Sequence, residues 1–177
     1  MTVRSASDSI NPALLQGEIL LQTRSHSAWG GACTASMYLP IERSHAWQQL
    51  TDYPRWVHYF PDVIKSEVSH RGDGLTSSGK RLYQMARKAF LMFTAEVEIH
   101  LRVIEVVQQQ IQFRMEKGSF VDFSADLKLQ DCGTGTLLIY TVAATPMIPI
   151  PSMFIQQAMC LDLPANMRRM RQVLCGR

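Results

Sequence analysis

The sequence predicts an α+β fold in which a curved antiparallel sheet of about six to seven strands packs around one long C-terminal helix, with two short helices after the first strand. Apolar and polar residues alternate along several consecutive segments in the middle of the chain, which is typical of strands with one buried face. The last segment instead has apolar residues three and four positions apart, as in an amphipathic helix. Such a helix would cover the apolar face of the sheet.

Length and composition restrict the class of protein before any motif is considered. The 177 residues are 46% hydrophobic and 19% charged, which indicates one globular domain and excludes a wholly disordered chain. The formal charge of +3 is too small for a dedicated nucleic-acid-binding protein, so no nucleic-acid partner is expected. No apolar run approaches the ~20 residues of a spanning helix, and residues 1–11 contain no secretory signal. We therefore expect a cytoplasmic protein.

The four cysteines do not form a metal-binding pattern. No two of them have the C-x-x-C spacing, and none lies beside a histidine at the spacing of zinc ligands. Without a secretory signal, reduced thiols are the expected state. The sequence therefore predicts neither a metal site nor a cofactor.

The N-terminal part of the chain divides into an arm and a first strand. Residues 1–16 are rich in serine and small residues, which predicts a flexible arm, and residues 17–177 form the single domain. Residues 18–39 alternate as a strand does, with Gly30 and Gly31 in the middle. A bulge and a hairpin turn at residues 29–33 are equally consistent with this glycine pair.

Two short helices are predicted after the first strand. Ala46, Trp47 and Leu50 have helical spacing, and a second short helix over 53–60 ends at Pro61. Two short helices cannot cross a sheet, so they should cover one of its edges. Their aromatic side chains are expected to pack against the sheet, and a role as a gate for a ligand is the alternative.

Six further strands and the long helix complete the predicted domain. Three of these strands, 93–106, 110–116 and 120–130, show one apolar and one polar face, and the last strand is apolar on both. The helix over 152–174 contains Pro164, which should bend it. The predicted strands are 63–70, 79–87, 93–106, 110–116, 120–130 and 136–145.

Three segments carry a resemblance to a known family. Residues 47–63 read WQQLTDYPRWVHYFPDV, which resembles the V-W-x-x-L-x-D-Y-x-x-x-x-x-F-x-P-x-V signature of the polyketide cyclase/dehydrase and coenzyme Q-binding branch of the START-like (SRPBCC) superfamily. Residues 116–123 read EKGSFVDF, which is similar to the x-x-G-x-F-x-x-F segment of that branch, and Pro149 and Pro151 match its proline entry to the last helix. The resemblance implies the helix-grip fold and a hydrophobic ligand, such as a lipid, quinone or polyketide-like compound, between helix and sheet.

The ligand would contact the inward-facing side chains of the strands and of the last helix. Many relatives have tryptophan where this chain has Leu127, so the identity of the ligand does not carry over. Methionines are flexible and suit an adaptable apolar site. The expected ligand-binding residues are Val97, Ile99, Leu101, Phe113, Met115, Val121, Phe123, Ala125, Leu127, Tyr83, Met153, Phe154 and Met167.

The leading hypothesis is a binding protein that transports, sequesters or presents its ligand. The predicted inner face has almost no ionisable groups, which disfavours acid–base catalysis. The rival hypothesis is the cyclase or dehydratase that the family name implies, with Tyr83, Tyr140 or His58 moving protons. A protein-interaction module is the third hypothesis. No catalytic residue is assigned.

Basic residues suggest peripheral contact with an anionic membrane. Arg81, Arg87 and Lys88 lie near the apolar stretch 90–93, and Arg168, Arg169 and Arg171 lie on the last helix. Ordinary solvated surface is the alternative for these cations. We also expect the last helix to move when a ligand enters, with a hinge at Pro164 and opposing lips at 72–74 and 90–93. The oligomeric state is not predicted.

Overall fold

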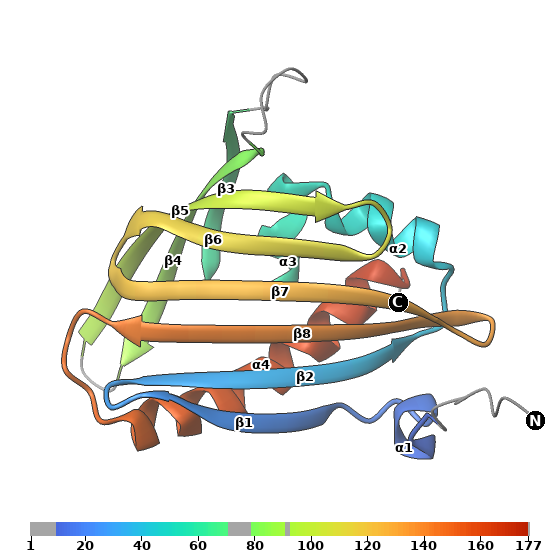
Figure 1. Ribbon diagram of the computed structural model, residues 1–177, viewed down its shortest axis with the longest axis horizontal. Helices are drawn as coiled ribbons and strands as arrows, with labels where there is room; N and C mark the ends of the chain where they lie inside the picture. The colour runs from blue at the N-terminus through green and yellow to red at the C-terminus, as the bar shows by residue number, and fades with distance from the viewer. Residues whose placement is uncertain (1–9, 71–78, 91–92, 177) are drawn as a thin grey trace, which may run out of the picture.

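The computed structural model describes residues 10–70, 79–90 and 93–176 and shows an eight-stranded antiparallel sheet packed against one long helix (Figure 1). The strands lie side by side in the order β1-β2-β8-β7-β6-β5-β4-β3. The strands are β1 (Leu20–Ser27), β2 (Gly30–Leu39), β3 (Val63–His70), β4 (Arg81–Phe90), β5 (Phe93–Val106), β6 (Gln110–Gly118), β7 (Phe120–Cys132) and β8 (Gly135–Pro146). The helices are α1 (Pro12–Leu15), α2 (Arg43–Leu50), the 3₁₀ turn η1 (Tyr53–Arg55), α3 (Trp56–Tyr59) and α4 (Ser152–Leu174).

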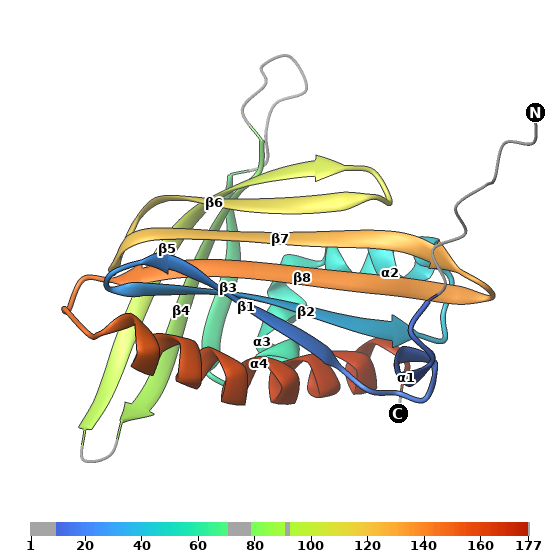
Figure 2. The ribbon, with the colours of Figure 1, turned by 60° about the horizontal axis from the view of Figure 1, so that its bottom comes forward.

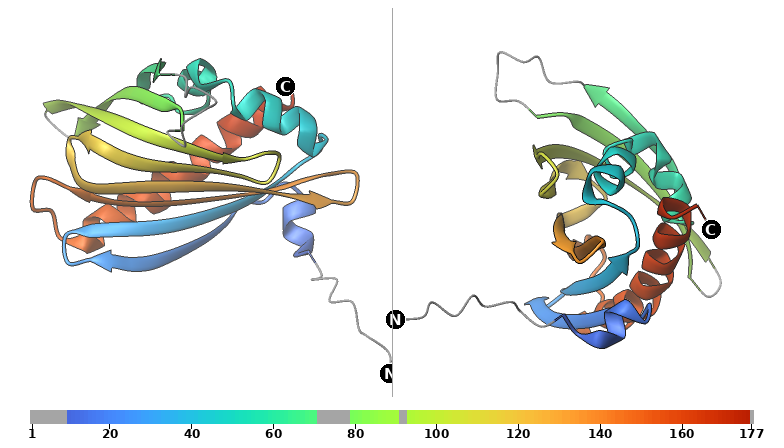
Figure 3. Two further views of the ribbon diagram at one scale, coloured as in Figure 1. Left: turned by 45° about the horizontal axis from the view of Figure 1, so that its top comes forward. Right: turned by 90° about the vertical axis from the view of Figure 1, so that its right-hand side faces the viewer.

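The sheet curves around α4, which crosses its concave face (Figures 2 and 3). We call this concave face the inner face and the opposite one the outer face. The short elements α2, η1 and α3 lie beside the C-terminal end of α4 (Figure 3). This arrangement confirms the predicted α+β class, the long C-terminal helix and the two short helices after the first strands.

The sheet has one strand more than the largest number predicted from the sequence, because residues 18–39 fold as a hairpin of two strands. Ser27 pairs with Gly30, and Ala28 and Trp29 form the turn between β1 and β2. Gly30 and Gly31 therefore begin β2 rather than the turn. A Cβ atom on Gly30 would lie 2.7 Å from the carbonyl oxygen of Ala144 on β8, so only glycine fits there. The hairpin resolves the choice that the glycine pair left open.

Part of the predicted flexible arm belongs to the fold. Residues 1–9 lie outside the described residues, but Pro12–Leu15 form α1, with the Asn11 side chain accepting a hydrogen bond from the Ala13 amide at 3.0 Å. Leu14 is buried. The expectation of a flexible arm up to residue 16 is therefore wrong for this short helix, since its one buried leucine packs against the domain.

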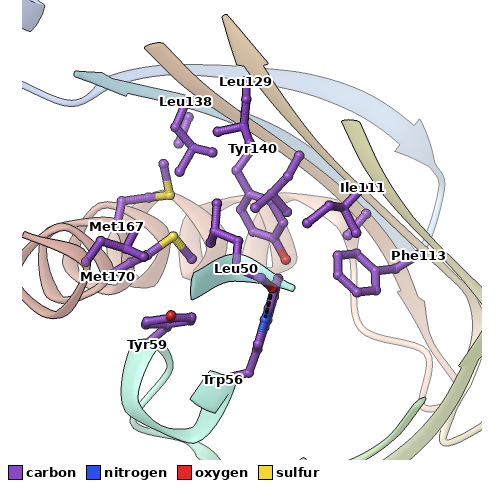
Figure 4. Close-up of a cluster of buried hydrophobic side chains, with 14 of the residues drawn as sticks. Leu50, Trp56, Tyr59, Ile111, Phe113, Leu129, Leu138, Tyr140, Met167 and Met170 are labelled. Carbon is purple, nitrogen blue, oxygen red and sulfur yellow. Dashed lines mark hydrogen bonds between the residues drawn. The ribbon is translucent and has the colours of Figure 1, made fainter. Parts of the chain in front are cut away.

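The aromatic residues of the short helices pack against the sheet (Figure 4). The Trp56 indole donates to the carbonyl of Leu50 at 2.9 Å, and its ring meets Phe113 of β6 edge to face at 5.0 Å between centroids. The Tyr59 hydroxyl donates to the carbonyl of Gln49 at 3.0 Å. These bonds support the packing interpretation of the aromatic residues.

A β-bulge near the start of β7 changes which side chains face inward. Phe120 pairs with Pro146 and Asp122 with Thr145, so Val121 is the extra residue of the bulge. Phe120 and Phe123 pack against the core, with their ring centroids 5.7 Å apart, whereas Val121 is 63% exposed. The expectation that Val121 lines a ligand site is therefore wrong.

The two ends of α4 offer a matched test of this packing. Met170 is completely buried and Met153 is 66% exposed. We expect Met170→Ala to lower the free energy of unfolding by about 2–5 kcal/mol because it creates a cavity in the core. Met153→Ala should change it by less than about 0.5 kcal/mol. Urea denaturation of both variants measures the difference, and equal losses would contradict the assigned packing.

Candidate functional site

Burial along the inner face changes from one end of the molecule to the other. On β8, Leu138 is fully buried whereas Val142 is partly exposed, and on β6, Phe113 is 2% exposed whereas Met115 is only partly buried. The same change occurs along α4, where every buried residue lies at or after Leu163. We call the two ends of the inner face the sealed end and the open end.

The open end is apolar although it is incompletely covered. Its side chains face the helix-bearing side of the sheet or come from α3 and α4, yet each keeps some contact with solvent. A closed core would bury such side chains completely. The residues of the open end are Phe60, Val97, Met115, Phe120, Phe123, Val142 and Met159.

The position of α4 explains why this end is open. A Cβ atom on Gly31 of β2 would lie 3.2 Å from side-chain atoms of Ile155 and Gln156 and 3.3 Å from the Met159 sulfur. The Ser152 amide also donates to the carbonyl of Ala28 at 3.3 Å. The N-terminal half of α4 therefore packs closely on the β1–β2 side of the sheet, which leaves the inward side chains at the open end of β5–β7 only partly covered.

One ion-pair cluster connects α4 to the opposite side of the sheet. The Lys88 ammonium on β4 donates to Asp62 at 2.8 Å and to Asp162 of α4 at 2.5 Å. Burial alone would lower the pKa of Lys88, but the hydrogen bonds that Lys88 donates to the Asp162 and Asp62 carboxylates outweigh it and raise the pKa. Lys88 therefore remains charged and holds the middle of the helix near the β3–β4 edge.

Tyr140 lies at the boundary between the two ends. It is 6% exposed, and its ring lies 6.0 Å from that of Phe60. Burial, and then the nearby Asp126 carboxylate, raise the pKa of its phenol well above the ordinary value. Figure 4 shows the ring between Leu129, Ile111 and Phe113 on one side and α4 on the other. Tyr140 is thus the predicted polar residue that does face inward.

Tyr83 and His58 do not lie at the open end. Tyr83 pairs with His100 across β4 and β5, and its hydroxyl donates to Glu98 on the outer face at 3.1 Å. His58 is exposed on α3, where its carbonyl accepts a hydrogen bond from Arg169 at 3.0 Å. The expectation that these two side chains contribute to an inner site is therefore wrong.

The other predicted ligand-binding residues fall into three groups. Three lie at the open end, namely Val97, Met115 and Phe123. Six belong to the buried core, namely Ile99, Leu101, Phe113, Ala125, Leu127 and Met167. Two are exposed near the start of α4, namely Met153 and Phe154, so they do not line the inner face as expected.

Sequence reasoning missed Phe60, Phe120, Val142 and Met159 as lining residues. The bulge moves Phe120 inward, and no residue type in that segment signals a bulge. Val142 lies on a strand that is apolar on both faces, so alternation does not fix which face it occupies. Met159 lies outside the apolar stripe that the sequence predicted for the last helix, although the methionines as a group were expected to suit an adaptable apolar site.

Other parts of the described chain offer no competing site near the open end. A separate surface pocket of about 350 Å³ lies among Arg43, the β5–β6 turn and the end of β7, on polar residues at the sealed end. The residues that the structure describes contain no cluster of histidine, cysteine and acidic side chains that could hold a metal ion. None of the described helices is long and apolar enough to cross a membrane.

The comparisons with known proteins agree with this architecture. Residues 39–171 match the family model described as polyketide cyclase/dehydrase and lipid transport. No curated protein matches the sequence. A START superfamily protein from Mycobacterium smegmatis superposes with a TM-score of 0.69 at 12% identity, covering 81% of this chain and 96% of that one.

Two further solved structures have the same fold. A STAR-related lipid transfer protein from Xanthomonas axonopodis gives a TM-score of 0.60 at 15% identity over 87% of this chain and 98% of that one. The Zhui aromatase/cyclase from a Streptomyces species gives 0.57 at 10% identity over 90% and 93%. At these identities the likeness establishes the helix-grip fold.

The ion pair between Lys88 and Asp162 should stabilise the N-terminal half of α4 against local unfolding. Asp162→Asn removes one ion pair to Lys88 and keeps the size of the side chain. We expect faster amide hydrogen exchange over residues 155–162, with the free energy of unfolding changed by less than about 1 kcal/mol because the pair is half-exposed. Asp62→Asn is the control, since it leaves the contact to α4 in place. Equal amide exchange rates over residues 155–162 in the wild type and Asp162→Asn would show that the Lys88–Asp162 ion pair does not stabilise this part of α4.

Proposed function

The chain belongs to the polyketide cyclase/dehydrase and lipid transport family, and from this premise we propose that it binds a hydrophobic small molecule at the open end of the inner face. A lipid, a quinone and a polyketide-like compound all have the required apolar body. The protein would transport, sequester or present this ligand. The quinone-binding branch named by the sequence resemblance and the cytoplasmic location remain predictions.

The observation that carries the proposal is the incomplete burial of the inward-facing apolar side chains. Exposed apolar surface is unfavourable by about 25 cal/mol per Å², so an apolar molecule that covers Phe123, Met115 and Val142 would be stabilised. The contact of α4 with Gly31 holds the helix on the β1–β2 side, so the open end of β5–β7 is only partly covered. The site is therefore largely formed before the ligand binds.

An enzymatic function has weaker support. Lys88 is held by two carboxylates, and the Tyr140 hydroxyl has no histidine or carboxylate within hydrogen-bonding distance among the described residues. General acid–base catalysis needs such a partner to accept or return the proton. Of the three residues predicted for a cyclase or dehydratase, Tyr140 alone faces the open end. We therefore favour binding over catalysis.

An uncharged segment after β8, next to the open end, supports contact with a membrane. Residues 147–161 contain no aspartate, glutamate, lysine, arginine or histidine. Within this segment Met147, Ile148 and Leu161 are each at least 66% exposed. Exposed apolar side chains in a stretch of sequence without charged residues suit the interface of a bilayer, where an apolar ligand could enter or leave without crossing water.

The basic residues contribute less to this contact than the sequence suggested. Arg81 pairs with Glu116 and Arg87 with Glu96, while Arg171 donates to the carbonyl of Gly17 at 2.7 Å. Ion pairing within the protein reduces the attraction of these cations to anionic lipids. The apolar stretch 90–93 and the turn 72–74 lie outside the described side chains. We therefore propose docking through residues 147–161.

Filling the open end tests ligand binding. Val142→Phe adds a ring at the open end, and Val107→Phe makes the same change at a side chain that is 70% exposed in the β5–β6 turn. We expect Val142→Phe to weaken binding at least tenfold, which is about 1.4 kcal/mol, and Val107→Phe to leave it unchanged. Displacement of a fluorescent fatty acid by a phospholipid, a short-chain ubiquinone and an aromatic polyketone measures the affinities.

Native mass spectrometry of the purified protein provides an independent check on bound molecules. The proposal predicts a co-purifying apolar compound that is absent after solvent extraction. No such compound, together with no binding of any of the three ligand classes to the wild type, would refute the proposed function.

Membrane contact is tested by a charge in the exposed segment. Ile148→Glu should reduce co-sedimentation with phosphatidylcholine vesicles at least fivefold, because a carboxylate is costly in the acyl region. Val107→Glu, at the opposite end of the molecule, should have no effect. Binding should depend only weakly on salt. Binding that tolerates Ile148→Glu and disappears at high salt would instead favour the basic residues.

A further inference from the structure

Almost every polar group among the buried aromatic side chains has a hydrogen-bond partner. The Tyr53 hydroxyl donates to Glu105 at 2.5 Å, the Tyr59 hydroxyl to the carbonyl of Gln49 at 3.0 Å and the Trp56 indole to the carbonyl of Leu50 at 2.9 Å. Buried donors in native proteins are satisfied in more than about 90% of cases. The exception among the described residues is Tyr140, whose hydroxyl has no partner although the residue is only 6% exposed.

The Tyr140 hydroxyl lies between the buried and the partly exposed residues of β8 and is not fully enclosed. Arg43 Nε is the one fully enclosed side-chain polar atom in the described residues that lacks a hydrogen bond. The Tyr140 oxygen also lacks one and is not among the enclosed atoms, so it borders on accessible space. Its neighbour toward the open end on β8 is the partly exposed Val142, and toward the sealed end it is the fully buried Leu138. The hydroxyl therefore lies at the inner limit of the open end.

Other polar groups on this side of the sheet are already engaged. Ser66 donates to the carbonyl of Tyr53 at 2.7 Å, and Gln84 donates to the Ser66 hydroxyl at 3.2 Å. Lys88 is paired with Asp62 and Asp162. A ligand that reaches inward would thus meet one unsatisfied donor in an apolar surrounding.

We infer that Tyr140 orients the ligand by donating a hydrogen bond, and that the ligand carries a carbonyl oxygen at the end of an apolar body. This inference rests on the proposed function and specifies its ligand class. Burial raises the pKa of Tyr140, so the phenol keeps its proton at neutral pH. A phenol donates better than it accepts because its ring delocalises a lone pair of the oxygen, and a carbonyl oxygen is a good neutral acceptor that cannot itself donate. A ketone, quinone or ester fits, whereas a plain hydrocarbon leaves the hydroxyl unpaired.

A pair of near-isosteric probes tests this assignment. 9-Fluorenone and fluorene have the same tricyclic shape, and only the ketone has an acceptor. We expect the wild type to bind fluorenone about three- to tenfold more tightly than fluorene, the range of a single neutral hydrogen bond. Tyr140→Phe should remove this preference by weakening fluorenone alone. Tyr83→Phe, which alters the outer face, should preserve it.

Infrared spectroscopy gives a readout that a structural role of Tyr140 would not move. The carbonyl stretch of bound fluorenone should lie at lower frequency in the wild type than in Tyr140→Phe. Equal affinity of the wild type for both probes, or equal weakening of both by Tyr140→Phe, would overturn the orienting role while the proposed function stands. Failure of the wild type to bind either probe or any apolar ligand would overturn both.

Discussion

The close packing of α4 on β2 at Gly31 determines the rest of the architecture. A single helix cannot cover an eight-stranded curved sheet, so its position decides which apolar side chains are buried. Because Gly31 has no side chain, Ile155 and Met159 approach the β2 backbone directly. The helix then packs beside β1 and β2, and only the apolar surface at the open end of β5–β7 remains for another molecule to cover.

Much of the fold could be predicted because local patterns determine it. Alternation predicted the bounds of β5, the glycine-containing sequence after residue 70 predicted the end of β3, and the proline lead-in and apolar stripe predicted α4. The β1–β2 hairpin could not be assigned because its turn consists of Ala28 and Trp29, which are not typical turn residues, whereas the glycines lie in the strand. The bulge at Val121 depends on pairing with β8, which a single segment does not reveal.

The site could be predicted less well than the fold. Alternation shows which face of a strand is apolar, but the coverage of that face depends on where α4 packs, which is a tertiary property. Ile99 and Leu101 were therefore grouped with Val97 although only Val97 lies at the open end. Tyr83 was assigned to the wrong face, and Tyr140 to the right one. That Tyr140 lacks a partner while Tyr53 and Tyr59 have one is visible only in three dimensions.

The side chains of α4 are buried unevenly along the helix. Its C-terminal half is fixed in the core by Met167, Met170 and Leu174, while the part before Leu163 has no buried residue and is held by its packing at Gly31 and by the Asp162–Lys88 ion pair. Pro164 cannot donate a hydrogen bond to the carbonyl of Cys160, so α4 bends most easily at the start of its buried C-terminal half. Bending of α4 at this point, rather than repacking of the sheet, would then accommodate ligands of different thickness. The stiffness of this one segment would set the range of ligand sizes that the protein accepts.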